Sequence, residues 1–190
     1  LAQYTQKPES EIAHRLTGNW EAQNTNFKKL ILEDRAADDY SKPYPFYLAY
    51  ALEDEVEDLG PCDQWQAEWK WDGIRGQVIF RGGEYYLWSR GEELISEKFP
   101  EFKSLIGKVP DGTVIDGEIL IYKDAKLKPF QDLQTRIGRK KVGPKLLKDH
   151  PAVLRAYDIL EYEHKDVRNK TMAERRKLLE SIFNQAHLHE

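Results

Sequence analysis

Lys70 and its neighbours combine residue types that could do chemistry. Trp69 and Trp71 adjoin the lysine, and a carboxylate stands two positions away on each side, as Glu68 and Asp72. In a strand, side chains alternate between faces, so the charged residues would form one polar row. The tryptophans would then face a core. Two readings remain open: a half-exposed strand with charged neighbours, or a polar floor built around one amine.

A glycine turn brings two arginines toward this lysine. Gly82-Gly83 is a two-residue turn signal between two strand-like runs. Counting outward from that turn places Arg75 directly opposite Arg90. Like charges directly opposite each other destabilise a strand pair, and an anion between them would remove the repulsion. This register predicts a phosphate or a nucleotide close to Lys70.

Two carboxylates lie on one face of an apolar segment. In TVIDGEILIY, Asp116 and Glu118 alternate with apolar residues. Such carboxylates are costly to bury without a partner. We expect a salt bridge to a neighbouring strand for Asp116. For Glu118 we expect a metal ion or a ribose hydroxyl, because the implied phosphate chemistry needs Mg2+. Tyr157, in VLRAYDIL, either faces the same pocket or is a core ring.

The net charge of -4 hides a strong asymmetry along the chain. Residues 51–62 include five acidic and no basic residues, whereas residues 126–150 carry eight Lys or Arg against two Asp. The simplest reading of such a basic run is a solvated face. A basic segment on an acidic protein is also a plausible contact for a phosphate backbone.

Several classes of protein are disfavoured by composition. A single cysteine, Cys62, excludes an intramolecular disulfide framework and fits a reducing compartment. No apolar run approaches the roughly 20 residues of a membrane helix, and no signal peptide is visible. We therefore expect an intracellular protein, cytoplasmic or nucleoid-associated, without a membrane partner. The first residue is Leu1, which suggests a processed or truncated chain. The sequence leaves the oligomeric state open.

The pattern of elements divides the chain in two. Residues 34–45 read as a linker, so we expect residues 1–42 to end one domain and residues 43–190 to form another, incomplete one. Helices are predicted over 10–16 and 26–33, and further helices are predicted to begin near Pro100, Pro129 and Thr171. Strands are predicted over 64–72, 74–81, 84–90, 113–122 and 152–160.

An ordered series of motifs resembles the covalent nucleotidyltransferases. The run from Lys70 to Arg75 matches their K-x-D-G-x-R signature. Four further motifs follow in family order: Ser89-Arg90-Gly91, Phe99-Pro100-Glu101, Asp116-Gly117-Glu118 and Ala156-Tyr157-Asp158-Ile159-Leu160. The segments PFYLAYALED and PFQDLQTRIGRK are similar to those of ATP-dependent DNA ligases, and the resemblance covers about residues 43–175. The segment around Thr17 resembles the end of the ligase DNA-binding domain.

The resemblance implies both a fold and a reaction. The fold would be an α+β, ATP-grasp-like nucleotidyltransferase domain, with antiparallel sheets and flanking helices. Lys70 would attack the α-phosphate of ATP, with Mg2+ as the metal, and hold AMP as a phosphoramidate. The AMP would pass to a 5'-phosphate in nicked double-stranded DNA, and a 3'-hydroxyl would displace it. An amine must be neutral to attack, and nearby cations favour the neutral form.

The same resemblance implies roles for the residues around the nucleotide. Glu68 would read the adenine amino group, Arg75 and Arg90 would hold ribose and phosphate, and the Tyr157 ring would pack near the nucleoside. Glu118 would meet the ribose or the metal ion, and Trp69 is also expected at the nucleotide. Asp72 would brace the loop.

The chain departs from the family pattern after Tyr157. The family continues with a Glu-Gly motif ending in Lys and a Lys-x-Lys pair, but no Glu-Gly dipeptide occurs here. We therefore expect a C-terminally truncated adenylation domain that does not seal nicks by itself. An mRNA-capping guanylyltransferase or an RNA ligase shares the lysine motif. A non-catalytic nucleic-acid-binding module, resting on residues 126–150, is the alternative outside enzymes.

Overall fold

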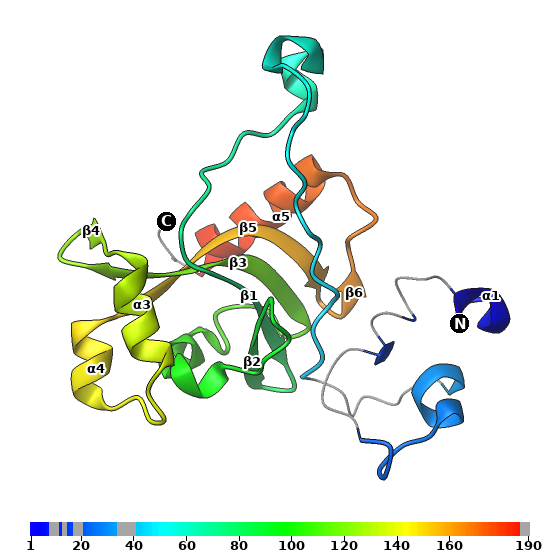
Figure 1. Ribbon diagram of the computed structural model, residues 1–190, viewed down its shortest axis with the longest axis horizontal. Coiled ribbons are helices and arrows are strands. Elements are labelled where there is room, and N and C mark those ends of the chain that lie inside the picture. Colours follow the sequence, from blue (N-terminus) through cyan, green and yellow to red (C-terminus); the bar gives the residue numbers. More distant parts are fainter. Residues whose placement is uncertain (8–11, 13–14, 17–20, 34–40, 187–190) are drawn as a thin grey trace.

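One antiparallel sheet forms the centre of the fold. The computed structural model describes residues 1–7, 12, 15–16, 21–33 and 41–186 (Figure 1). The strand order is β2-β1-β3-β5-β6, with β4 beside β3. The strands are β1 (Ile74–Arg81), β2 (Glu84–Ser89), β3 (Thr113–Lys123), β4 (Lys126–Leu127), β5 (Ala152–Tyr162) and β6 (Lys165–Asp166). Four of the five predicted strands are therefore confirmed, as is the α+β class.

The glycine hairpin has the register that its turn predicted. Gly82 and Gly83 both have positive φ, at 65° and 73°, the conformation that a two-residue turn of this type requires. Gln77 lies opposite Trp88 as a result. On its other side β1 pairs with β3, and β3 pairs with β5. The middle of the sheet is thus built from three adjacent antiparallel strands.

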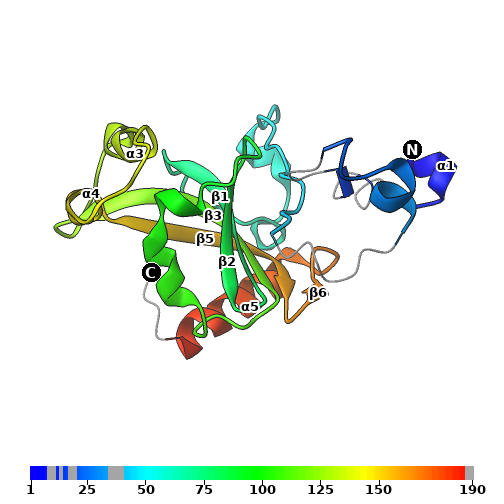
Figure 2. The same cartoon turned by 90° about the horizontal axis from the view of Figure 1, so that it is seen from below.

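Helices cover one face of this sheet. Helix α5 (Met172–Gln185) and the 3-10 helix over Pro100–Leu105 pack on this face, while α3 (Phe130–Ile137) and α4 (Pro144–Asp149) lie at one end of the sheet (Figure 1). The helix predicted to begin near Thr171 does so with a capping box, in which the Thr171 hydroxyl accepts from Glu174 N–H. Apolar residues of β3, such as Ile115 and Ile119, pack with Leu179 of α5 in the main core. Figure 2 shows the sheet between α5 and the segment that precedes β1.

A short strap, residues 41–46, covers part of the opposite face. The Gln77 carboxamide donates to Tyr44 C=O at 2.9 Å and accepts from Tyr44 N–H at 2.8 Å. The Tyr44 hydroxyl donates to Glu161 at 2.7 Å, and Glu161 also pairs with Arg81. These contacts join the strap to β1 and β5. The rest of this face, around Asp116 and Glu118, is not covered by the strap.

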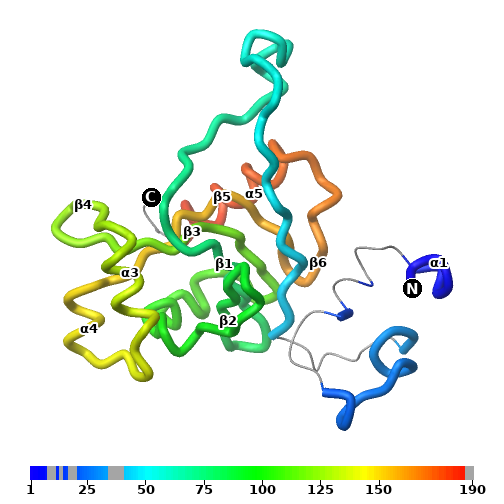
Figure 3. Tube along the Cα trace, in the orientation of Figure 1, coloured from blue at the N-terminus to red at the C-terminus, as the bar shows by residue number. Residues whose placement is uncertain are grey.

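The strand predicted over 64–72 is wrong. Residues 47–73 leave the sheet as a long arm with 3-10 turns at Val56–Leu59 and Cys62–Gln64 (Figure 3). Trp65 is 55% exposed and Trp69 is 83% exposed, so these rings are not core residues. The alternation of aromatic and charged residues implied a pleated face, but among the described residues no strand pairs with this segment.

The part of the chain before the strap is only partly described. It contains α1 (Ala2–Thr5) and a π-helical turn over Lys28–Leu32, where a longer helix was predicted. Ile12, Leu30 and Ile31 are buried together. The helix predicted over 10–16 falls mostly outside the described residues, and the boundary at residue 42 stays a prediction. Within the described residues, no helix combines the length and apolarity needed to cross a membrane.

Candidate functional site

All seven predicted site residues line one cleft, of about 1460 Å³, between the arm and the uncovered part of the sheet. They come from the arm, from β1, from the turn after β2, from β3 and from β5: Glu68, Trp69, Lys70, Arg75, Arg90, Glu118 and Tyr157. Lys70 and Glu68 are exposed, and Glu68 accepts a hydrogen bond from the Gln66 amide. The structure therefore brings together residues that are up to 89 positions apart in sequence, from Glu68 to Tyr157.

Gly73 holds the end of the lysine loop against β3. A Cβ at this position would lie 2.3 Å from the Ile119 carbonyl oxygen, so only glycine allows the observed approach. Burial raises the pKa of the Glu118 carboxyl, and a hydrogen bond donated by Gly73 N–H partly offsets that rise. The loop that carries Lys70 is thereby tied to β3 three residues after the lysine.

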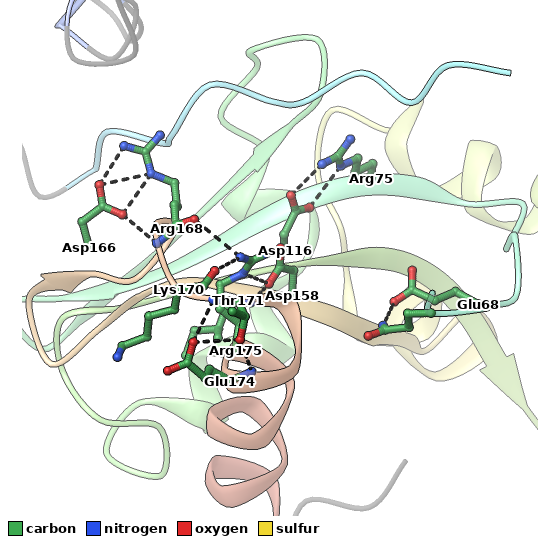
Figure 4. A network of polar contacts seen from close by, with 12 residues as sticks. Glu68, Arg75, Asp116, Asp158, Asp166, Arg168, Lys170, Thr171, Glu174 and Arg175 are labelled. Carbon is green, nitrogen blue, oxygen red and sulfur yellow. Dashed lines mark hydrogen bonds and ion pairs between the residues drawn. The ribbon is translucent and has the colours of Figure 1, made fainter. Parts of the chain in front are cut away.

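Arg75 and Asp116 form a bidentate ion pair on the cleft floor. Arg75 Nε and Nη2 donate to the two Asp116 oxygens at 3.2 and 2.8 Å (Figure 4). The salt bridge expected for Asp116 is confirmed. Burial raises the pKa of the Asp116 carboxyl, while the Arg75 guanidinium acts against that shift. Burial lowers the pKa of Arg75, but hydrogen bonding to Asp116 and its charge more than offset that effect.

The anion predicted between Arg75 and Arg90 is not needed to relieve a repulsion. Arg90 N–H donates to Arg75 C=O at 3.1 Å, so the backbones are neighbours as the register implied. The Arg75 side chain, however, turns to Asp116 and also donates to the Tyr47 carbonyl. The positive charge of Arg75 is therefore already paired with the Asp116 carboxylate. Both arginines line the cleft, but the argument from like charges was wrong.

Glu118 is a half-buried carboxylate that contacts the end of the lysine loop at Gly73. Desolvation raises its pKa, and the charges of Arg75 and Arg90 partly reverse that shift. No group of three or more potential metal ligands occurs among the described side chains. Glu118 can therefore offer one carboxylate to a cation whose other ligands are water and phosphate oxygens, which is the usual arrangement for Mg2+.

A register shift in β5 aims Tyr157 into the cleft. Asp116 pairs with Asp158, but the next β3 residue, Gly117, pairs with Ala156, so Tyr157 has no partner across the ladder. Such bulges re-aim side chains next to functional sites. The Tyr157 hydroxyl lies 3.3 Å from Asp116. Burial, together with the Asp116 charge, raises its pKa. The ring therefore stays neutral.

An ion pair that was not predicted lies directly next to this bulge. Arg175 of α5 binds Asp158 through two hydrogen bonds, at 2.7 and 3.0 Å, and donates to Lys170 C=O (Figure 4). Both partners line the cleft. Asp158 lies in a recognised motif, which was one available signal. The position of Arg175 on the α5 face toward β5 was the other.

The basic segment reaches the cleft at Ile137 and Gly138, which line it. Its Arg136 is fully buried and donates to Lys98 C=O, His150 C=O and the Glu101 carboxylate. The Lys98 ammonium in turn donates to the Arg139 carbonyl at 2.6 Å. These bonds fix a loop on which Arg139, Lys140 and Lys141 are exposed. One of the eight cations is therefore structural.

Comparison with known sequences assigns a family to this arrangement. The sequence model described as "ATP dependent DNA ligase domain" matches residues 47–189. The chain belongs to the ATP-dependent DNA ligase family. It is 34% identical to the DNA ligase of Archaeoglobus fulgidus over 140 residues, which are 73% of this chain and 24% of that protein. Over 140 residues it is 33% identical to the DNA ligase of Acidianus ambivalens, covering 71% of this chain and 23% of that protein.

Solved ligase structures share its fold. The mycobacterial DNA ligase D complexed with ATP and MES is 27% identical, with a TM-score of 0.52 over 62% of this chain and 36% of that one. The ligase domain from M. tuberculosis LigD gives 26% identity and a TM-score of 0.51. The chain spans about a quarter of the length of the two ligases of Archaeoglobus fulgidus and Acidianus ambivalens.

Proposed function

We propose that this chain carries the nucleotide-transfer site of an ATP-dependent DNA ligase, with Lys70 as the residue that takes AMP from ATP. The observation that carries the proposal is the cleft itself. Lys70, Arg75, Arg90, Glu118 and Tyr157 line it together. Membership of the ligase family and a solved relative complexed with ATP support the nucleotide.

The proposed reaction begins with the lysine amine. Neutral Lys70 Nζ attacks the α-phosphorus of ATP, the bond from that phosphorus to the bridging oxygen breaks, and pyrophosphate leaves. The nitrogen loses a proton and a phosphoramidate of AMP remains. The adenylyl group then moves to a DNA 5'-phosphate, and attack by a 3'-hydroxyl releases AMP. Covalent catalysis of this kind divides one difficult step into easier ones.

The residues around Lys70 would mainly position the nucleotide rather than take part in making or breaking bonds. Transfer of a phosphoryl group is served mainly by orientation and by cations near the phosphate. Arg90 lines the cleft and its side chain is exposed, so it can reach a bound phosphate. Arg75 is held by Asp116 and lies 6.0 Å from the centre of the Tyr157 ring. We assign Arg75 and Tyr157 to the nucleoside side, and Glu68 and Trp69 to the adenine end.

Glu118 is the proposed protein ligand for Mg2+. Its raised pKa falls when a cation binds, because a positive charge favours the ionised carboxylate. When bound, the metal would neutralise charge on the phosphates. The remaining ligands would be phosphate oxygens and water.

The proposed second substrate is nicked double-stranded DNA, and the loop 139–141 is our candidate for a backbone contact. Its three cations are exposed at the rim of the cleft, and its backbone is held by Lys98. Cations fixed near a reaction site bind phosphates with a strong dependence on salt. A strand held there would lie close to the adenylyl group on Lys70.

Labelled nucleotides distinguish this proposal from its alternatives. The complete protein would be incubated separately with α-labelled ATP and α-labelled GTP, and then denatured. We expect label from ATP to remain on the protein, followed by joining of nicked duplex DNA. Label from GTP would indicate a capping guanylyltransferase, and joining of RNA alone would indicate an RNA ligase. DNA binding without any retained label would indicate a non-catalytic binding module.

A further inference from the structure

We propose that Arg155 positions the nucleophilic lysine by stacking on Trp71. The Arg155 guanidinium carbon lies 5.5 Å from the centre of the Trp71 ring. That distance is within the range of an attractive cation–π contact. Trp71 directly follows Lys70, and Arg155 lies on β5, so the contact links the arm to the sheet. The proposal rests on the proposed function only in taking Lys70 as the nucleophile.

The register of the sheet shows why Arg155 can reach the arm. Arg75 lies opposite Glu118, and Glu118 lies opposite Arg155, on three adjacent strands. Residues directly opposite each other in antiparallel strands point to the same face. Arg155 therefore shares the cleft face with Glu118, and the central carboxylate is flanked by two cations. The planar guanidinium of Arg155 offers the arm a flat surface on which the Trp71 indole can lie.

Trp71 differs from the other tryptophans of the arm. Trp69 and Trp65 are mostly exposed, whereas Trp71 is half-buried and lines the cleft. The ring centres of Trp69 and Trp71 are 6.4 Å apart. Trp71 therefore connects the exposed part of the arm with the sheet. Lys70 sits between the exposed ring and the anchored one.

Two anchors on the same side of Lys70 would fix its backbone. Gly73 is held against β3 by its close approach to Ile119 and its N–H bond to Glu118. Trp71 is held against β5 by Arg155. Small errors in the position of a nucleophile are costly, because in-line attack requires the reacting atoms to be aligned. Loss of the stacking pair should therefore slow AMP attachment more than it weakens ATP binding.

A double-mutant cycle tests this role in the complete protein. The four members are the natural protein, Trp71→Leu, Arg155→Met and the double variant. Either single change should slow formation of the AMP adduct at saturating ATP by about tenfold, the order expected for a partly buried cation–π pair. The KM for ATP should change little. The double variant should be no slower than the slower single variant, because the pair acts as one unit.

Conservative variants and a matched control separate positioning from stability. Trp71→Phe and Arg155→Lys keep a ring and a cation, so each should retain most of the rate. Trp65→Leu removes an exposed tryptophan of the same arm, whose indole donates to Leu59 C=O, and should leave the rate unchanged. Additive rate losses in the cycle would overturn the proposal, as would conservative variants as slow as Trp71→Leu and Arg155→Met at equal thermal stability.

A readout without catalysis separates this inference from the proposed function. In this chain, the indole N–H resonance of Trp71 should shift in Arg155→Met and return in Arg155→Lys. The resonance of Trp65 should not move. If Trp71 responds but AMP forms on another lysine, the contact stands and the assignment of Lys70 fails. If Trp71 does not respond to Arg155→Met, the stacking pair itself is refuted.

Discussion

At the scale of single residues, the cleft contains one buried ion pair that serves both fold and site. Asp116 is buried on β3, and Arg75 supplies its matching charge from β1. The sequence indicated that Asp116 would have a salt bridge, because a carboxylate on an apolar strand needs a partner. It did not indicate which arginine. The identity of the partner depends on strand order, because β1 lies between β2 and β3 and the Arg75 side chain could bind a group on either strand.

Replacing Arg75 should cost stability as well as activity. In Arg75→Ala the Asp116 carboxylate would remain buried without its cation, which typically costs about 3 kcal/mol of unfolding free energy. The repulsion expected between Arg75 and Arg90 implied that this substitution would leave the fold intact, and the ion pair corrects that expectation. The matched control is Arg90→Ala. Because the Arg90 side chain is exposed, its removal should lower the free energy of unfolding only slightly. Urea unfolding of both variants measures the difference; equal stabilities would contradict it.

The loss in Arg75→Ala should depend on pH. Burial raises the pKa of Asp116 above its ordinary value of 3.8, and removing Arg75 removes a cation that opposes this rise. A carboxyl with a raised folded-state pKa stabilises the fold below its unfolded pKa, and this stability is lost as pH rises through the folded pKa. The deficit relative to the natural protein should therefore be larger near pH 8 than near pH 4. A deficit that does not change with pH would show that Asp116 is not its source.

At the scale of elements, turn chemistry decided what could be predicted. The Gly82-Gly83 hairpin was predicted with its register because glycine accepts positive φ at both turn positions. Two similar turns were missed. Asp124-Ala125 and Glu163-His164 also have positive φ, without any glycine to signal it. The arm was mispredicted for a different reason. Alternating aromatic and charged residues form a buried and an exposed face only where a neighbouring strand pairs with the segment.

Gly73 should be the glycine of the site that tolerates substitution least. In Gly73→Ala the new methyl would meet the Ile119 carbonyl at 2.3 Å and Leu120 at 2.6 Å. The arm must then move away from β3, so we expect both lower stability and slower AMP attachment. Gly91→Ala is the control, because its nearest atom would be Ser89 Oγ at 3.7 Å. Thermal unfolding and adduct formation test this; identical behaviour of the two variants would argue against the close approach.

At the scale of the whole molecule, the cleft lies between a sheet with a well-defined core and a mostly exposed arm. Figure 1 shows this arm extending away from the sheet. The motifs predicted which residues would meet there, because the family pattern fixes their order along the chain. They did not predict the contacts of Arg155 and Arg175, which depend on how β5 and α5 place these side chains against Trp71 and Asp158. The amino-acid composition indicated the basic segment, but only the fold shows that Arg136 within it is buried.

The loop 139–141 should set the salt dependence of DNA binding. Replacing Arg139, Lys140 and Lys141 together by Gln removes three cations at the cleft rim. The slope of log K against log salt should then become shallower by about 2 to 3. The control replaces three exposed lysines elsewhere, Lys165, Lys170 and Lys177, by Gln for the same change in charge. Fluorescence anisotropy with nicked duplex DNA provides the measurement, and equal slopes for the two triple variants would refute the contact.

The identity of the nucleophile is the central claim, and peptide mapping tests it most directly. The complete protein would be incubated with ATP and Mg2+, digested under conditions that preserve phosphoramidates, and examined by mass spectrometry. We expect one AMP adduct, on the peptide that contains Lys70, and none in Lys70→Ala. An adduct on another cleft lysine such as Lys98, or one that persists in Lys70→Ala, would contradict it.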